Sequence, residues 1–236
     1  MPGGCIEEAA STVITVRTRT QIRPRLVLAS ASPARRKLLQ AAGIEPEVLV
    51  SGVDESGIEA ASAEQLCLEL ARRKAQAVAD RVLAAIVAGH LPPGDTLVLG
   101  CDSVLEFQGE VYGKPGDASE AFKRWQRMRG QAGVLHTGHC LIKGDARAAA
   151  VASTVVHFAE VTDDEIAAYM ATGEPLNVAG AFTIDGIGGA FVERIEGNAG
   201  TVIGLSLPLL RALLADLGHS ITELWTHRAE PGPAIT

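Results

Sequence analysis

The chain has 236 residues, 47% of them hydrophobic, which is enough to bury a sizeable core in one large domain or two small lobes. Its formal net charge of -7 disfavours a protein that coats nucleic acid, because such proteins present a broad basic surface. The four cysteines are scattered without a C-x-x-C pair, which disfavours a zinc cage or a disulfide framework. No apolar run approaches the roughly 20 residues of a membrane span, and the N-terminal region lacks the apolar core of a signal peptide. We therefore expect a cytoplasmic protein that binds neither membrane nor nucleic acid.

The domain organisation follows from where regular patterns begin and end. Residues 1–24 mix Gly, Ser, Thr and Arg without a sustained period, and we predict a disordered extension there. Residues 25–224 are predicted to form one domain with two lobes around a cleft, and residues 225–236 a loose tail.

Strands and helices alternate in the first half of the chain, whereas strands pair with each other later. This pattern predicts an α/β fold with a mixed central sheet and flanking helices. Helices are expected after the N-caps Ser32, Ser62, Asp117, Thr162 and Ser206. Strands are expected at 26–29, 47–50, 96–100, 104–111 (a hairpin turning at Gln108-Gly109), 134–142 and 146–158, with short strands and turns over 180–204.

The segment from residue 26 to residue 39 runs an apolar strand directly into a helix start that carries two adjacent arginines, Arg35 and Arg36. The free N–H groups and the positive dipole end of such a helix suit a phosphate. The same pattern also caps helices with a purely structural role, and arginines on a first turn often only face solvent. This segment alone leaves both interpretations open.

Asp102 directly follows the apolar strand expected at 96–100, the position at which α/β proteins commonly place side chains that face a ligand. A carboxylate there can hold a divalent cation or take a proton from water. An aspartate at the end of a strand can equally cap a turn. Asp54 and Glu55 offer two more carboxylates, again just past an expected strand.

Two lysines complete the set of charged candidates. Lys114 lies in a turn flanked by Gly and Pro, which would hold its ammonium group in a defined place, although such turns with a solvated lysine are ordinary. Lys74 follows Arg72 and Arg73 on a long helix, where only one of the three side chains can point inward.

Carboxylates, cations and a strand-to-helix N-terminus together are what a triphosphate site requires. Phosphate oxygens need several cations and backbone donors, and a hard Mg²⁺ or Mn²⁺ ion needs one or two carboxylates plus phosphate oxygens. The chain contains neither a G-x-x-x-x-G-K-[ST] sequence nor a G-x-G-x-x-G sequence after its first strand. The sequence therefore points to a triphosphate site of another type.

Eight short motifs, in this order and spacing, resemble the Maf family of nucleoside triphosphate pyrophosphatases. They lie at residues 28–36, 53–55, 71–75, 101–103, 113–115, 136–138, 179–182 and 202–205. The resemblance implies a mixed α/β fold with a deep cleft, similar to the inosine triphosphatase architecture. It also implies hydrolysis of a nucleoside triphosphate, including non-standard or modified ones, to the monophosphate and pyrophosphate, and a homodimer.

The resemblance also implies roles for individual residues. Asp102 would be the proton acceptor that activates water or a metal ligand, and Glu55 would help to hold the metal ion, Mg²⁺ or Mn²⁺. Catalytic roles fall on Lys74 and Lys114 as well. Ser30, Arg35 and Arg36 would bind the triphosphate with these lysines, and Ser103 and Asp185 would contact the substrate near the base.

The chain departs from the family pattern at three positions. Gly133 stands where a histidine is expected, Asp185 replaces a glutamine of the pyrimidine-selective branch, and Ser103 replaces a threonine. The preferred base is therefore open. The family's association with septum formation also leaves a second hypothesis, a nucleotide-sensing regulator of cell division with little turnover.

Overall fold

The computed structural model describes residues 23–58 and 60–226. The N-terminal extension predicted for residues 1–24 therefore lies outside the described residues except for Arg23 and Pro24. The tail predicted for residues 225–236 lies outside them beyond Thr226.

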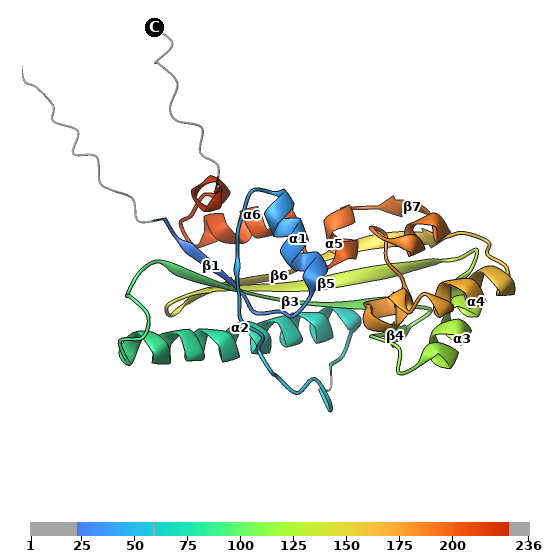
Figure 1. Cartoon of the computed structure of the whole chain (residues 1–236), viewed down its shortest axis with the longest axis horizontal. Coiled ribbons are helices and arrows are strands. Elements are labelled where there is room, and N and C mark those ends of the chain that lie inside the picture. Colours follow the sequence, from blue (N-terminus) through green and yellow to red (C-terminus); the bar gives the residue numbers. More distant parts are fainter. Residues whose placement is uncertain (1–22, 59, 227–236) are drawn as a thin grey trace, which may run out of the picture.

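The centre of the molecule is a seven-stranded mixed sheet with the order β2-β1-β3-β5-β6-β7, and β4 pairs with β3 (Figure 1). β1 is parallel to β2 and β3, and the other neighbours are antiparallel, which confirms the predicted mixed sheet. The strands are β1 Arg25–Leu28, β2 Glu47–Val48, β3 Thr96–Phe107, β4 Glu110–Tyr112, β5 Ala132–Lys143, β6 Ala146–Phe158 and β7 Val192–Glu196.

Helices cover both faces of the sheet. The long helix α2 runs along one face, α1, α5 and α6 lie on the other, and α3 and α4 lie together at one end (Figure 1). The helices are α1 Pro33–Ala41, α2 Ala63–Val87, α3 Ala118–Met128, α4 Asp163–Ala171, α5 Ala199–Ile203 and α6 Leu207–Asp216, with short 3₁₀ turns η1 Glu174–Asn177, η2 Ala179–Ala181, η3 Ile187–Phe191 and η4 Ile221–Leu224.

The predicted N-caps are confirmed, because each cap side chain accepts a hydrogen bond from a backbone N–H of the first helical turn. Thr162 forms a full capping box with Glu165. Ser62 caps α2, but the Gln65 side chain accepts from the N–H of Ala61 instead of the N–H of Ser62. The remaining caps are Ser32, Asp117 and Ser206.

The core divides along the sheet. Around α3 and α4, aromatic side chains pack edge to face about Trp125, with ring centroids 5.5 Å from Phe158 and 5.7 Å from Tyr169. At the other end, one apolar cluster lies between α2 and the sheet, and another lies between the sheet and helices α1 and α6. The middle of β3 joins the two ends.

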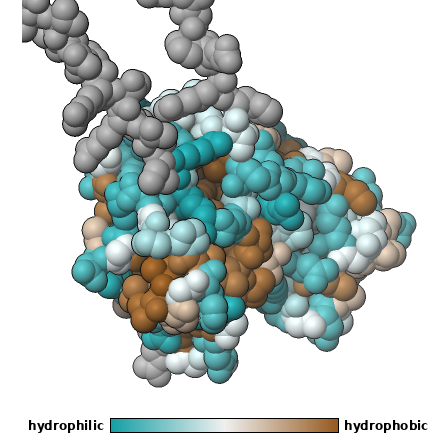
Figure 2. All heavy atoms as spheres, turned by 60° about the vertical axis from the view of Figure 1, so that its left-hand side comes forward, coloured by the Kyte–Doolittle hydropathy of each residue, from teal (hydrophilic) through white to brown (hydrophobic). Residues whose placement is uncertain are grey.

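α2 is apolar on more than the side that faces the sheet. Its outward residues Leu83 and Val87 are exposed. Figure 2 brings this end of the molecule forward and shows apolar side chains gathered in its lower part. Val78 and Val82, on the side of the same helix that faces the sheet, are buried.

β3 has an open edge that the sequence patterns did not reveal. β5 pairs with one edge over Val98–Glu106, so β1 and β4 must share the other. β1 pairs with β3 only as far as Leu99, and β4 begins its pairing at Leu105. Among the described strands, none pairs with residues 100–104 on that side, and we call this stretch the open edge of β3. The C-terminal ends of β1 and β4 lie at the two ends of this open edge.

The expectation that a strand ends at Gly100, with Asp102 just past it, is wrong. β3 continues to Phe107 because β5 keeps pairing with it, and Asp102 lies opposite Gly138 within the ladder. The predicted turn at Gln108-Gly109 is confirmed, with φ of 51° and 80°.

Two further strand predictions are wrong in part. β2 is shorter than predicted and ends at Val48. The region 180–204 forms 3₁₀ turns and a short helix with one strand, because much of it folds around the Glu174 carboxylate. That carboxylate accepts hydrogen bonds from the N–H groups of Ile187 and Gly188 and from the Thr183 hydroxyl.

Candidate functional site

Asp102 lies at the open edge of β3 with its side chain on the face covered by α2. Its Oδ1 lies 2.5 Å from Nζ of Lys74, and the same ammonium lies 2.8 Å from Oε1 of Glu55. Asp102 and Lys74 are both buried, whereas the Glu55 side chain is more than half exposed. One cation therefore holds together two carboxylates that are far apart in the sequence.

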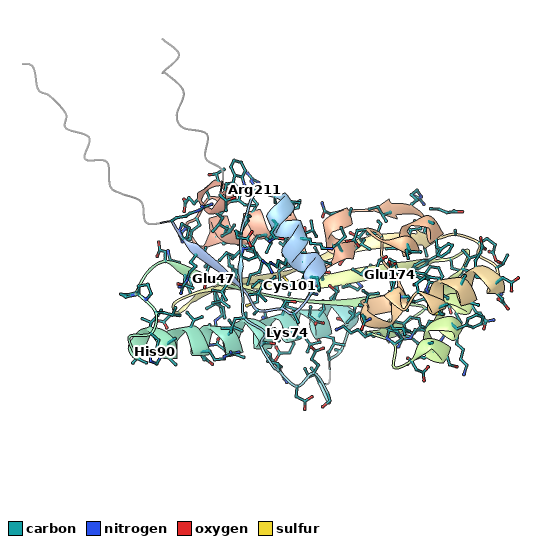
Figure 3. All side chains as sticks on the ribbon, viewed as in Figure 1. Glu47, Lys74, His90, Cys101, Glu174 and Arg211 are labelled. Carbon is teal, nitrogen blue, oxygen red and sulfur yellow. The ribbon has the colours of Figure 1, made fainter. Side chains whose placement is uncertain are left out.

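Two glycines allow α2 to bring Lys74 to this place. A Cβ atom at Gly100 would lie 2.2 Å from the carbonyl oxygen of Ala71, and one at Gly138 would lie 2.3 Å from that of Cys67. The backbone of α2 therefore rests directly on β3 and β5. Figure 3 shows Lys74 beneath the middle of the sheet, on the helix that passes under it. Arg72 and Arg73 are exposed, so the expectation that one of the three basic residues points inward is confirmed.

The pKa of Asp102 is raised above its ordinary value, mainly because burial penalises the charged carboxylate. The positive charges of Lys74 and Arg35 act in the opposite direction but do not cancel this effect. A carboxylate with a raised pKa is a stronger base when it is ionised. The direction of this shift is the one expected for a carboxylate that accepts a proton.

Arg35 lies on the other face of the sheet, where its guanidinium is held on three sides. Nε donates to the carbonyl oxygen of Gly204 at 2.7 Å, and Nη1 donates to Oγ of Ser30 at 2.9 Å. Nη2 donates to Oγ of Ser103 at 3.1 Å. A planar guanidinium with this many fixed partners presents a defined positive charge next to the N-terminus of α1.

A chain of hydroxyl groups links this arginine to α5. The Thr137 hydroxyl donates to the carbonyl oxygen of Thr201 at 2.8 Å. Since its proton is used there, the 2.8 Å contact between Ser103 and Thr137 must have Ser103 as donor. Ser103 therefore accepts from Arg35 and donates to Thr137, and both of its hydrogen-bond directions are set.

His139 supports the same region from β5. Its Nδ1 lies 3.0 Å from the carbonyl oxygen of Thr137, and its Nε2 accepts from the N–H of Ser206 at 2.9 Å. The accepting role of Nε2 assigns the proton to Nδ1. Burial lowers the pKa of His139 to about 4, so the ring is neutral at physiological pH.

The structure does not bring all the predicted residues into contact. The Arg36 side chain is exposed and pairs with Glu45 at 3.4 Å on the outside of α1. Lys114 and Asp185 are also exposed, on the loop after β4 and on the loop before η3. Their predicted contacts with a substrate stay predictions.

Glu55 and Asp102 suit a hard divalent cation in their chemistry. Their carboxylates already flank one positive charge, that of Lys74. Within residues 23–58 and 60–226, no group of three or more His, Cys, Asp or Glu side chains forms a metal site. Two carboxylates are nevertheless what Mg²⁺ commonly takes from a protein when phosphate oxygens and water complete its shell. The donor set therefore fits the predicted metal.

Sequence reasoning missed three residues of this region, Thr137, Gly204 and His139, which support Arg35 beside the predicted Ser30 and Ser103. Thr137 and Gly204 lie within motifs that carried the resemblance, but no spacing pattern distinguishes them from ordinary strand and turn residues. His139 has only its position two residues after Thr137 as a signal, since alternate residues of a strand share a face.

Comparison with known proteins shows the family of the chain. The family model described as Maf-like protein matches residues 25–217. A protein of Salinispora tropica named nucleoside triphosphate pyrophosphatase is 66% identical over 211 residues, covering 89% of this chain and 91% of its own. Proteins with the same name from Streptomyces coelicolor and Microcystis aeruginosa are 56% and 53% identical. They align with 87% and 85% of this chain, and with 96% and 98% of their own lengths.

Proposed function

Because the chain belongs to the Maf family, we propose that it hydrolyses nucleoside triphosphates to the monophosphate and pyrophosphate. The observation that carries the proposal is the ammonium of Lys74 between the carboxylates of Asp102 and Glu55. Asp102 lies at the open edge of β3, and the residue that follows it, Ser103, contacts the fixed guanidinium of Arg35. Acid–base and anion-binding groups thus meet at one place.

In the proposed reaction, Asp102 accepts a proton from water while the water oxygen attacks the α-phosphorus. The bond between the α-phosphorus and the oxygen bridging it to the β-phosphorus breaks, and pyrophosphate leaves with that oxygen. Negative charge that develops on the phosphate oxygens is offset by Arg35 and by the N–H groups at the start of α1. Lys74 keeps the Asp102 carboxylate in place.

Glu55 would hold the divalent cation, Mg²⁺ or Mn²⁺, and Asp102 would be its second carboxylate ligand in the alternative in which it does not take the proton from water. Such an ion polarises phosphoryl oxygens and neutralises charge on the triphosphate. Lys114, on the loop that leaves β4 beside the open edge, would contact the phosphates on the side away from α1. Arg36 would join them by turning away from Glu45, an exposed ion pair that costs little to break.

Ser103 and Asp185 are proposed to influence the choice of base. Their identities differ from the family pattern, and Asp185 is exposed on a loop that the Glu174 carboxylate holds by its backbone. An aspartate accepts hydrogen bonds but donates none when ionised, whereas a glutamine does both. This difference is expected to change which base edge is preferred.

A panel of nucleoside triphosphates, each with Mg²⁺ or Mn²⁺, tests the function. The expected products are the monophosphate and pyrophosphate, separated by ion-exchange chromatography. Release of orthophosphate with the diphosphate would exclude the proposed reaction. Binding of nucleotides without turnover under both metals would instead favour the nucleotide-sensing regulator.

The proposed assembly is a homodimer, and the proposed location is the cytoplasm. None of the helices in the described part of the chain has the length and hydropathy needed to cross a membrane. A homodimer follows only from the family resemblance, and sedimentation velocity of the purified chain tests it. A cytoplasmic location rests on the composition, and fluorescence microscopy of a tagged chain tests it.

A further inference from the structure

The loop that carries Lys114 is held at both ends by one ion pair of α3. Nη1 of Arg124 donates to the carbonyl oxygen of Gly113 at 2.7 Å. Oε2 of Glu120 accepts from the N–H of Gly116 at 2.7 Å. Arg124 and Glu120 also bind each other directly through Nη2 and Oε1. The two anchored peptide groups bracket Lys114.

Arg124 is unusually well fixed for a residue on an outer helix. Its side chain is mostly buried, and its guanidinium lies over the ring of Tyr112, 4.7 Å from the ring centroid. Cation–π contact and several hydrogen bonds leave a planar guanidinium little freedom. The hydrogen bond from Gly116, followed by that from Arg124, lowers the pKa of Glu120 below its ordinary value. The ion pair therefore persists at neutral pH.

The same anchor point receives a second segment of the site. The N–H of Gly180 also donates to the carbonyl oxygen of Gly113, at 3.2 Å. Gly180 begins the stretch that leads to Asp185. The Gly113 carbonyl thus links the Lys114 loop by hydrogen bonds to α3 and to the segment proposed to influence the choice of nucleobase.

We propose that Arg124 is a positioning residue, which with Glu120 fixes the loop so that the Lys114 ammonium reaches the substrate phosphates. This inference rests on the proposed function, in which Lys114 contacts the triphosphate. A lysine on a mobile loop must be ordered each time a substrate binds, and that cost opposes both binding and alignment. Anchoring the backbone on both sides of Lys114 removes the backbone part of this cost in advance.

α3 offers a matched control for this role. Arg127 also lies over the Tyr112 ring, at 5.8 Å, and also pairs with a glutamate, Glu110, through contacts of 2.8 and 2.9 Å. Within the described part of the chain, no hydrogen bond or ion pair joins the Arg127 side chain to the Lys114 loop. Arg127→Ala therefore removes the same charge, a ring contact and an ion pair from the same helix.

Steady-state kinetics and inhibition by pyrophosphate provide the test, on the full chain with its preferred triphosphate. We expect Arg124→Ala to lower kcat/KM by between about 10- and 100-fold and to weaken inhibition by pyrophosphate. Lys114→Ala is expected to do the same, and Arg127→Ala to remain within about twofold of the unchanged protein. Because Arg124→Ala also removes packing, Glu120→Ala is a second variant, which frees the other end of the loop from a half-exposed position.

A double variant separates positioning from general stability. If Arg124 acts through Lys114, adding Arg124→Ala to Lys114→Ala produces little further loss. If the double variant instead lost the product of the two single losses in kcat/KM, the inference would be overturned and the proposed function would stand. The same holds if Arg124→Ala and Glu120→Ala had a normal rate while Lys114→Ala was slow. A normal rate in Lys114→Ala would instead remove Lys114 from the site, and the inference with it.

Discussion

The absence of a Cβ atom at Gly100 allows α2 to pack closely on β3, and this packing places Lys74 beside Asp102. A Cβ at this position would lie 2.2 Å from the carbonyl oxygen of Ala71, and 2.7 Å from the nitrogen of Ala75. Ordinary contact begins near 3.4 Å, so Gly100→Ala is short of space by about 1 Å. The obstructing atoms belong to the backbone of α2, so the whole helix must move away from β3.

Lys74 lies between the two obstructing residues and moves with them. A displacement of about 1 Å in a reacting group can cost about 100-fold in rate, and Lys74 holds the proposed base, Asp102. Overpacking of a tight core contact costs about 3 kcal/mol at the upper end of its usual range. In a domain of this size, that loss lowers Tm by about 6–12 °C.

Thermal unfolding and steady-state kinetics of Gly100→Ala measure both effects. Gly94→Ala is the control, because a Cβ there meets nothing within 4 Å, and its expected change in stability lies within about 0.5 kcal/mol. If Gly100→Ala kept the Tm and kcat of the unchanged protein, the close contact between α2 and β3 would not determine the position of Lys74.

Three further predictions concern charge. Asp102→Asn should lower kcat by about 10²- to 10⁴-fold, the usual contribution of a general base, with an unchanged circular dichroism spectrum; a normal rate would remove Asp102 from proton transfer. Burial raises the pKa of Asp102, and the charge of Lys74 opposes this effect. Lys74→Gln should therefore raise the pKa of Asp102 further and move the acid limb of the kcat/KM profile to higher pH. The control Lys123→Gln, on α3, should leave the acid limb where it is. Burial lowers the pKa of His139 from 6.5 to about 4. Between these pH values the unfolded chain binds a proton at this residue more readily than the folded chain does. The free energy of unfolding should therefore fall by about 3 kcal/mol as the pH drops from 6.5 to 4. Denaturant titrations at several pH values check this, and His139→Gln should lose that part of the slope.

Local signals in the sequence predicted local structure well. The N-caps and the turn at Gln108-Gly109 depend on side chains and backbone angles within a few residues, and all of them are confirmed. The helical period of residues 72–74 also predicted that one of the three basic side chains points inward, and the structure shows that it is Lys74. Each of these depends on contacts near in sequence.

The parts that sequence reasoning missed depend on contacts between distant segments. Asp102 seemed to follow a strand because Gly100 interrupts an apolar run. That glycine instead makes room for α2, while pairing with β5 carries the strand onward. Likewise, the Gly204 carbonyl that fixes Arg35 lies 169 residues away in the sequence, whereas Arg36 meets solvent and Glu45. These distinctions arise only when the segments pack.

The continuation of β3 past Gly100 explains how one site can use both faces of the sheet. Consecutive residues of a strand point to opposite faces, so Asp102 meets Lys74 of α2, while Ser103 meets Arg35 and Thr137 on the other side. In the interior of a sheet, two such residues could not touch the same small ligand, because neighbouring strands would separate them. Here neither β1 nor β4 covers residues 100–104. In the proposed function, a triphosphate lying along this open edge would therefore reach Asp102 on one face and Arg35 on the other, which a strand ending at Gly100 would not allow.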